Sequence, residues 1–165
     1  MNKEQVGLAG EYAVASRICS RGHYAHVTYG NMKEMDILVY SNKSYIKVEV
    51  KSKSGLSWPF IRGIPNDDSH ILVFVDYETK KDRADNFSIT PDFYVLDGQD
   101  WQNILEGLKT NPAYAGPDAK DGYSPTWNNS KKKGHTIKLD HIKAHKGKWE
   151  KVDKLLEKRE RASCL

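Results

Sequence analysis

Two short runs of strand-like residues, separated by a compact turn, constrain the fold of this chain more than any other feature. Residues 35–40 and 45–51 are rich in Ile, Val and Tyr, and they flank Ser41-Asn42-Lys43-Ser44. Such a pattern is typical of a β-hairpin. If the hairpin is symmetric about its turn, opposed residues have numbers that sum to 85. Position 40 then faces 45, 38 faces 47 and 36 faces 49.

The alternation of side chains along the second run supports this register. Successive side chains point to opposite faces of a strand, so Ile46, Val48 and Val50 share an aliphatic face. In the proposed pairing Ile37 and Val39 join that face. A slip by one residue would bury the charged set instead. The opposite face then carries Tyr45, Lys47, Glu49 and Lys51.

The register predicts that Asp36 and Glu49 are cross-strand neighbours. Two carboxylates roughly 5 Å apart repel by on the order of 3 kcal/mol at an effective dielectric near 20. Lys51 lies two positions beyond Glu49 on the same face, and its amine cannot sit between both acids. A divalent cation can. Carboxylate oxygens with water in the remaining positions are what Mg²⁺ selects, so we expect a magnesium site here.

The rest of the chain predicts one α/β (α+β) domain over residues 1–165, with a central mixed β-sheet flanked by helices. Helices are expected at three places, the second with Asp100 as its N-cap, and residues 112–135 are expected to form a long loop. The predicted helices span residues 3–21, 100–110 and 148–161; the other predicted strands span residues 25–29, 70–76, 92–96 and 136–142.

The charge of the chain is unevenly distributed. Residues 1–110 carry 13 Lys and Arg against 15 Asp and Glu, a net −2, whereas residues 111–165 carry 13 against 7, a net +6. A basic C-terminal extension of about 111–165 is suited to a polyanion, because displaced counterions supply affinity for phosphates. A solvated lysine-rich face explains the charge equally well.

The ordered motifs in residues 3–55 resemble those of the PD-(D/E)xK nuclease superfamily, which includes restriction endonucleases and Holliday-junction resolvases. The matching elements are Glu11 on the first helix, Asp36 on the first strand of the hairpin, and the tripeptide Glu49-Val50-Lys51. Met35 departs from the family pattern, which has proline before the acid. The resemblance implies a restriction-endonuclease-like core and a metal-dependent endonuclease that hydrolyses DNA.

The resemblance also implies a role for each matching residue. Asp36, Glu49 and Val50 would bind Mg²⁺, with Mn²⁺ as an alternative ion, and Lys51 would position the attacking water. Glu11 would be an auxiliary catalytic residue. Its spacing alone is better explained by an exposed acid at the edge of an amphipathic helix. DNA would be held by basic and aromatic side chains outside the hairpin: Lys53, Trp58, Arg62, Tyr123, Trp127, Lys131, Lys132 and Lys133.

Each DNA-binding residue has an alternative role. For Trp58 and Trp127 core packing is favoured over base stacking, and for the lysine triplet phosphate contact is slightly favoured over solvation. For the whole chain, one rival is a nucleic-acid-binding or partner-binding protein with this fold that does not cut. The other is an exposed hairpin whose polar face has no catalytic role.

Other features of the sequence indicate the cellular location and the possible partners of the protein. No apolar run is long enough to cross a bilayer, and Cys19 and Cys164 lie too far apart for a metal motif, so we expect a cytoplasmic protein with no membrane partner. A homodimer is plausible, because cutting a duplex commonly uses two active sites. A zinc site built from His135, His141 and His145 is disfavoured, because no further ligand completes it.

Overall fold

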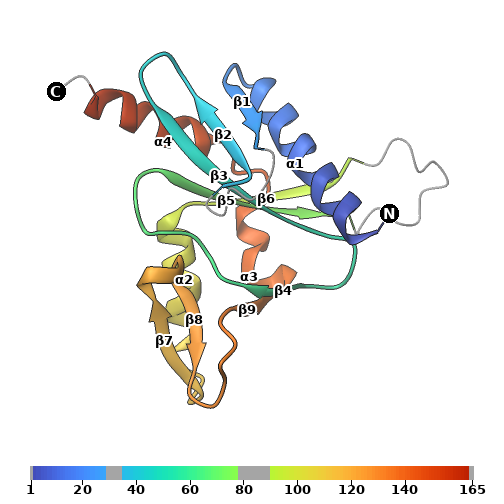
Figure 1. Cartoon of the computed structure of the whole chain (residues 1–165), viewed down its shortest axis with the longest axis vertical. Coiled ribbons are helices and arrows are strands. Elements are labelled where there is room, and N and C mark those ends of the chain that lie inside the picture. The colour runs from blue at the N-terminus through green and yellow to red at the C-terminus, as the bar shows by residue number, and fades with distance from the viewer. Residues whose placement is uncertain (1, 29–34, 78–89, 164–165) are drawn as a thin grey trace.

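The computed structural model describes residues 2–28, 35–77 and 90–163. Five strands form a central mixed sheet in the spatial order β1-β2-β3-β5-β6 (Figure 1). The first three strands pair antiparallel, β3 and β5 run parallel, and β6 returns antiparallel to β5. The expected α/β class with helices flanking a mixed sheet is therefore confirmed. The bounds are β1 (Tyr24–Val27), β2 (Ile37–Tyr40), β3 (Tyr45–Lys53), β5 (His70–Asp76) and β6 (Asp92–Leu96).

The register of the β2–β3 hairpin is the predicted one. Tyr40 pairs with Tyr45, and the ladder continues with residue numbers that sum to 85 until Ile37 pairs with Val48. It stops there, one residue short of the expected Asp36–Glu49 pair. The amide of Asp36 donates instead to the carbonyl of Val48, at 3.1 Å. Asp36 therefore lies just beyond the end of β2, outside the ladder.

Two helices cover one face of the sheet. Helix α1 (Lys3–Cys19) and helix α4 (Glu150–Ala162) pack on the aliphatic side chains predicted to share a face of the hairpin (Figure 1). Ile37, Ile46 and Val48 are fully buried there. The alternation read from the sequence is confirmed, and it leaves the polar face of β3 on the other side of the sheet.

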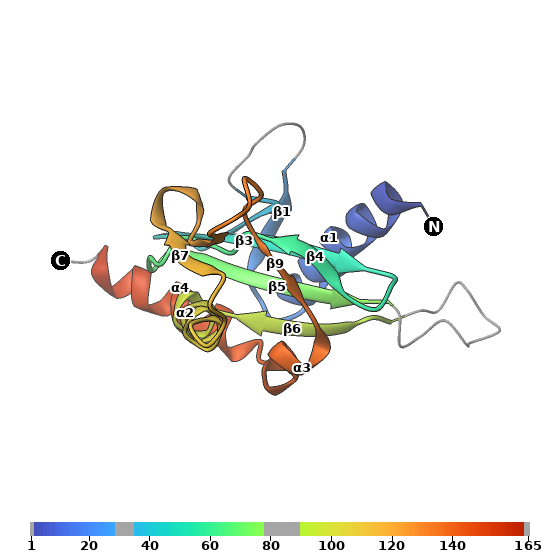
Figure 2. The same ribbon diagram turned by 90° about the horizontal axis from the view of Figure 1, so that it is seen from below.

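The other face is covered over β5 and β6 by smaller elements. Figure 2 shows β4 and β9 crossing in front of β5, with α2 alongside. Their buried side chains form a second apolar cluster around Trp58, Phe74 and Trp101. Within the described ranges, no helix is both long and apolar enough to cross a membrane. The elements are β4 (Trp58–Ile61), α2 (Gly98–Leu108), β9 (His135–Ile137) and α3 (Leu139–Ile142).

The structure corrects three predicted elements. The expected loop 112–135 contains a hairpin of β7 (Tyr114–Asp118) and β8 (Ser124–Trp127), in which two prolines face each other and hide the strand pattern. The expected strand 136–142 is split into β9 and α3. The N-cap of α2 is Asp97, not Asp100; the two side chains form a reciprocal capping box.

Gly10 sets how closely α1 approaches β3. A Cβ atom at this position would lie 1.8 Å from Ser52 Oγ and 3.0 Å from Ser52 Cβ. Rotation of the serine hydroxyl relieves only the first contact. We expect Gly10→Ala to lower the free energy of unfolding by about 1–3 kcal/mol, because overpacking shifts the helix. Urea denaturation measures the change.

Gly7 offers a matched control on the same helix. A Cβ atom there meets no heavy atom within 4 Å, so Gly7→Ala is expected to stabilise the protein by up to about 1 kcal/mol through helix propensity. Equal stabilities for the two alanine variants would show that α1 does not depend on close contact at Ser52.

Candidate active site

Asp36 is fixed at the open end of β2 by its backbone and its side chain. Its amide donates to Val48, and its carbonyl accepts from the amide of Thr28 at 2.9 Å. Its carboxylate Oδ2 accepts a hydrogen bond from the amide of Val50 at 2.6 Å. The Asp36 side chain thus accepts the hydrogen bond that a backbone carbonyl would accept from Val50 if the β2–β3 ladder continued. A carboxylate held in this way is preorganised for a ligand at the strand end.

Glu49 and Lys51 project from the polar face of β3. Lys51 Nζ lies 2.6 Å from Glu49 Oε1, and the two side chains are 29% and 26% exposed. An ion pair between residues i and i+2 requires that both side chains lie on the same face, as the alternation predicted. The amine is therefore positioned next to Glu49 and remains within reach of solvent.

Glu11 lies close enough to this group to interact with it electrostatically. The pKa of Glu11 is raised, first by burial against the sheet and then by the negative charge of Asp36, while the positive charge of Lys51 opposes the rise. Gly10, the residue before Glu11, packs on β3 at Ser52. Helix α1 therefore brings Glu11 toward Asp36 and Lys51, as the motif order implied and its spacing alone did not.

The donors at this strand end suit a hard divalent cation held by few protein ligands. Within the described part of the chain, no three Asp, Glu, His or Cys side chains are grouped closely enough to hold a metal ion by themselves. Mg²⁺ commonly binds one or two carboxylates and keeps waters or substrate phosphate in its other positions. Asp36, Glu49 and a main-chain oxygen would be the ligands if this end of the hairpin binds such an ion.

Val50 can supply the main-chain oxygen. In an antiparallel strand, the N–H and C=O groups of one residue point toward the same neighbour. The Val50 amide bonds the Asp36 carboxylate, so the Val50 carbonyl lies on the side of β3 that faces Asp36. The side chain of Val50 packs in the core on α1 and contributes no chemistry.

Two predicted DNA-binding residues are interior residues. Lys53 Nζ lies 2.7 Å from Asp76 Oδ1 and 2.9 Å from the carbonyl of Gly55, and it stands 4.5 Å from the centre of the Trp58 ring. Trp58 is itself 1% exposed. A phosphate cannot reach this ammonium group, nor a base this ring, so we exclude both from the DNA-binding surface.

Trp127 and Tyr123 are partly buried and make packing and hydrogen-bond contacts near β8 and β9. Trp127 Nε1 donates to the carbonyl of Gly134 at 2.9 Å, and its ring packs edge-on against Tyr114. The carbonyl of Tyr123 accepts from Trp101 Nε1. These contacts support the packing role that was favoured for Trp127.

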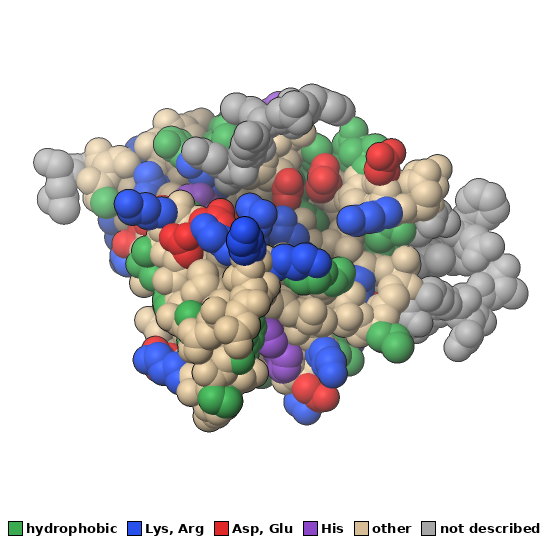
Figure 3. Space-filling model, turned by 60° about the horizontal axis from the view of Figure 1, so that its bottom comes forward, with side chains coloured by type: hydrophobic (Ala, Val, Ile, Leu, Met, Phe, Trp, Pro, Cys, Tyr) green, Lys and Arg blue, Asp and Glu red, His purple; other side chains and the backbone are tan. Residues whose placement is uncertain are grey.

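The remaining predicted cations gather at one place. Arg62, Lys131, Lys132 and Lys133 line a hollow of about 540 Å³ together with Phe60. Arg62 also lines a neighbouring hollow of about 450 Å³ that contains Glu49. Figure 3 shows Lys and Arg side chains gathered across the middle of one face, beside acidic ones. Arg62 thus links the hollow of the lysine triplet to the hollow that contains Glu49.

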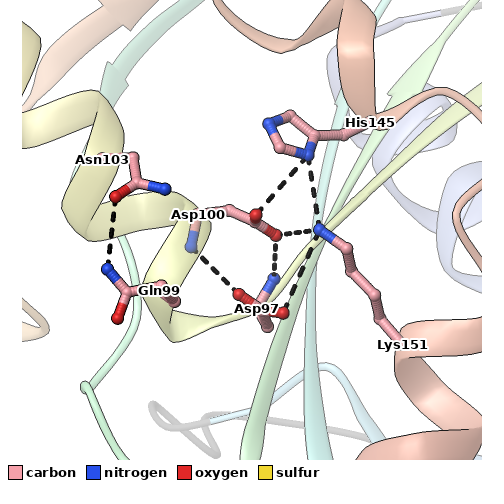
Figure 4. A network of polar contacts seen from close by, with 6 residues as sticks. All are labelled: Asp97, Gln99, Asp100, Asn103, His145 and Lys151. Atoms are coloured by element: carbon pink, nitrogen blue, oxygen red, sulfur yellow. Dashed lines mark hydrogen bonds and ion pairs between the residues drawn. The ribbon is translucent and has the colours of Figure 1, made fainter.

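A second polar cluster brings Asp100 to the three histidines that the sequence offered as a disfavoured zinc site. Asp100, His135, His141 and His145 line a hollow of about 350 Å³ beside α2. Burial raises the pKa of Asp100, but the hydrogen bonds from Lys151 and from the Asp97 amide, together with the positive charges of Lys151 and His145, lower it below its usual value. Lys151 also contacts His145 Nδ1, at 3.3 Å (Figure 4). The three histidines do meet at one hollow, but they form no metal-binding group among the described residues.

No family model, curated protein or solved structure matches this chain. A functional assignment therefore depends on the residues gathered around Asp36 and on the basic surface beside them.

Proposed function

We propose that this protein is a Mg²⁺-dependent nuclease that hydrolyses phosphodiester bonds in DNA, with a core of the PD-(D/E)xK type. The observation that carries the proposal is the docking of the Asp36 carboxylate on the Val50 amide, beside the Glu49–Lys51 ion pair. Asp36 lies just beyond the end of β2, and Glu49 and Lys51 project from the neighbouring strand β3. A structural hairpin has no need of this grouping.

Each residue has a role that follows from its position. Asp36, Glu49 and the carbonyl of Val50 would hold the ion. Bound Mg²⁺ supplies a Lewis acid that polarises the phosphate and lowers the pKa of a bound water. Glu11 adds negative charge behind Asp36 and would hold a water or a ligand of the ion.

Lys51 would orient the attacking water. Its ammonium group has three donors, and the ion pair with Glu49 uses one of them. The other two can bind a water and a non-bridging phosphate oxygen, which aligns the water for in-line attack. The same positive charge stabilises the negative charge that develops on the phosphate.

The basic surface supports DNA as the substrate. Cations at the hollow lined by Lys131, Lys132 and Arg62 would bind phosphates without regard to sequence. The hollow with Glu49 adjoins it at Arg62. A strand bound along the lysines would thus run toward Glu49. We expect this activity in the cytoplasm, and a homodimer if both strands of a duplex are cut.

Cutting is expected only with a divalent cation and with Lys51 present. Purified protein incubated with plasmid, linear, single-stranded and branched DNA should cut in Mg²⁺ or Mn²⁺ and be inactive in EDTA. Lys51→Ala is expected to lower the rate about 100-fold, because removal of one preorganised donor costs on the order of 10²–10³ in rate. Gel electrophoresis of the products measures the rates.

Lys43→Ala is the matched control, because Lys43 lies in the turn at the far end of the same hairpin. This variant should cut like the wild type. Cutting that persists in EDTA would refute the metal mechanism. DNA binding without cutting in any metal would favour the non-cleaving protein instead.

A further inference from the structure

Phe60 is an exposed aromatic residue in a strand that should have buried it. Trp58 and Ile61 of β4 are buried, whereas Pro59 and Phe60 between them are exposed, so the normal alternation is broken. Phe60 is 58% exposed, and its φ of 54° is uncommon for a residue other than glycine. The backbone thus adopts an unfavourable conformation that presents the ring to solvent.

The neighbouring strand maintains this conformation. Ile61 pairs with His135 of β9, and the β4–β9 register shifts between Trp58 and Ile61. Gly134 approaches so closely that a Cβ atom there would lie 2.7 Å from the carbonyl oxygen of Phe60. Irregular pairing that re-aims a side chain is characteristic of bulges near functional sites. The exposure of Phe60 is therefore built into the fold.

Cations surround the exposed ring. Lys132 Nζ stands 5.4 Å from the ring centre, and Arg62 and Lys131 line the same hollow. Of the lysine triplet, Lys133 is paired with Asp118 at 2.5 Å. No carboxylate partner of Lys131 or Lys132 is found in the ranges that the structure describes. Arg62 lies 3.6 Å from Asp121. An exposed aromatic face beside two lysines without a carboxylate partner suits a chain that carries both planar rings and negative charges.

Nucleic acid with unpaired bases has this chemistry. In a duplex each base face is covered by its neighbours, so a protein ring cannot stack on it without unstacking the helix. A single strand offers both its base faces and its phosphates, and proteins bind it with aromatic platforms in positively charged grooves. The hollow of Phe60 also adjoins the hollow of Glu49 at Arg62.

We propose that Phe60 is a stacking platform for an unpaired base, that Arg62, Lys131 and Lys132 bind the flanking phosphates, and that the preferred DNA contains a single-stranded segment. The inference rests on the proposed function for its link to cutting, but the binding itself needs neither a metal nor catalysis. The hairpin residues 36–51 and the lysine triplet do not indicate which form of DNA is bound. Phe60 adds a preference for single-stranded segments.

Binding in EDTA tests the inference apart from the nuclease activity. Fluorescence anisotropy with an oligothymidine and with a duplex of equal length should show tighter binding of the single strand. Phe60→Gly, which tolerates the positive φ, should weaken single-strand binding about 5- to 100-fold, the range expected for loss of one stacked base. It should change duplex binding less than about threefold. Phe60→Tyr should bind like the wild type.

Two further variants separate the explanations. Leu56→Ala removes another exposed apolar side chain, outside the hollow, and should leave binding unchanged. Asp140→Asn removes a highly exposed acid of α3 that lies outside the hollow, and it should bind single-stranded DNA as the wild type does. Unchanged single-strand affinity in Phe60→Gly, or equal losses for single strand and duplex, would overturn the inference even if the protein cuts DNA. If Phe60→Gly weakens single-strand binding as expected but the wild-type protein never cuts DNA, only the nuclease proposal is overturned.

Discussion

Asp36→Asn is expected to slow Mg²⁺-dependent cutting of DNA by at least about 10³-fold while the protein stays folded. The asparagine carbonyl can still accept the hydrogen bond from the Val50 amide, so the strand end keeps its geometry. The negative charge is lost, and with it the principal ligand for the ion. Lewis-acid stabilisation is worth several kcal/mol, and about 1.36 kcal/mol corresponds to each tenfold change in rate.

Thermal unfolding gives a second readout that does not need activity. A ligand that binds only the folded state raises its stability, so Mg²⁺ should raise the Tm of the wild type but not that of Asp36→Asn. Asp140→Asn is the control, because Asp140 is a highly exposed acid on α3 and should cut normally. Cutting by Asp36→Asn within tenfold of the wild-type rate would remove Asp36 from the proposed mechanism.

The hairpin and the buried strands could be predicted because their signal is local. Strands β5 and β6 begin and end at the predicted residues, since continuous apolar runs bounded by polar residues leave little choice. The register of β2 and β3 follows from the alternation of aliphatic and charged residues around one turn. The elements β4, β7 and β8 were missed, because prolines interrupt each of them and none shows that alternation.

The candidate site was predictable only where its residues are close in sequence. Glu49 and Lys51 lie on one strand, and their pairing follows from spacing. The placement of Asp36 beyond the ladder does not, because it depends on a hydrogen bond from Val50 that a symmetric hairpin model lacks. The exposure of Phe60 depends on Gly134, which lies far along the chain. Positive φ at a phenylalanine leaves no mark in a single sequence.

Lys53 was predicted to bind DNA because its partner lies far away in the sequence. Its substitution is expected to cause the largest loss of stability. Its partner Asp76 lies opposite it on β5, and the two side chains are only 6% and 1% exposed. Lys53→Met is expected to lower the free energy of unfolding by about 3–5 kcal/mol, because it removes the ammonium group that pairs with the buried Asp76 carboxylate. Chemical denaturation followed by tryptophan fluorescence measures the loss.

Lys51→Met tests the role of burial with the same substitution two residues away. Lys51 pairs with Glu49 at a similar distance, but both side chains are partly exposed, so the loss should be at most about 1 kcal/mol. Cutting should fail in Lys51→Met although the fold persists. In Lys53→Met, cutting should persist below the unfolding transition, because Lys53 touches no part of the proposed site.

The double variant Lys53→Met/Asp76→Leu should recover much of the lost stability, since a buried ion pair replaced by apolar groups is often neutral. Equal losses for Lys51→Met and Lys53→Met would mean that burial does not distinguish the two ion pairs.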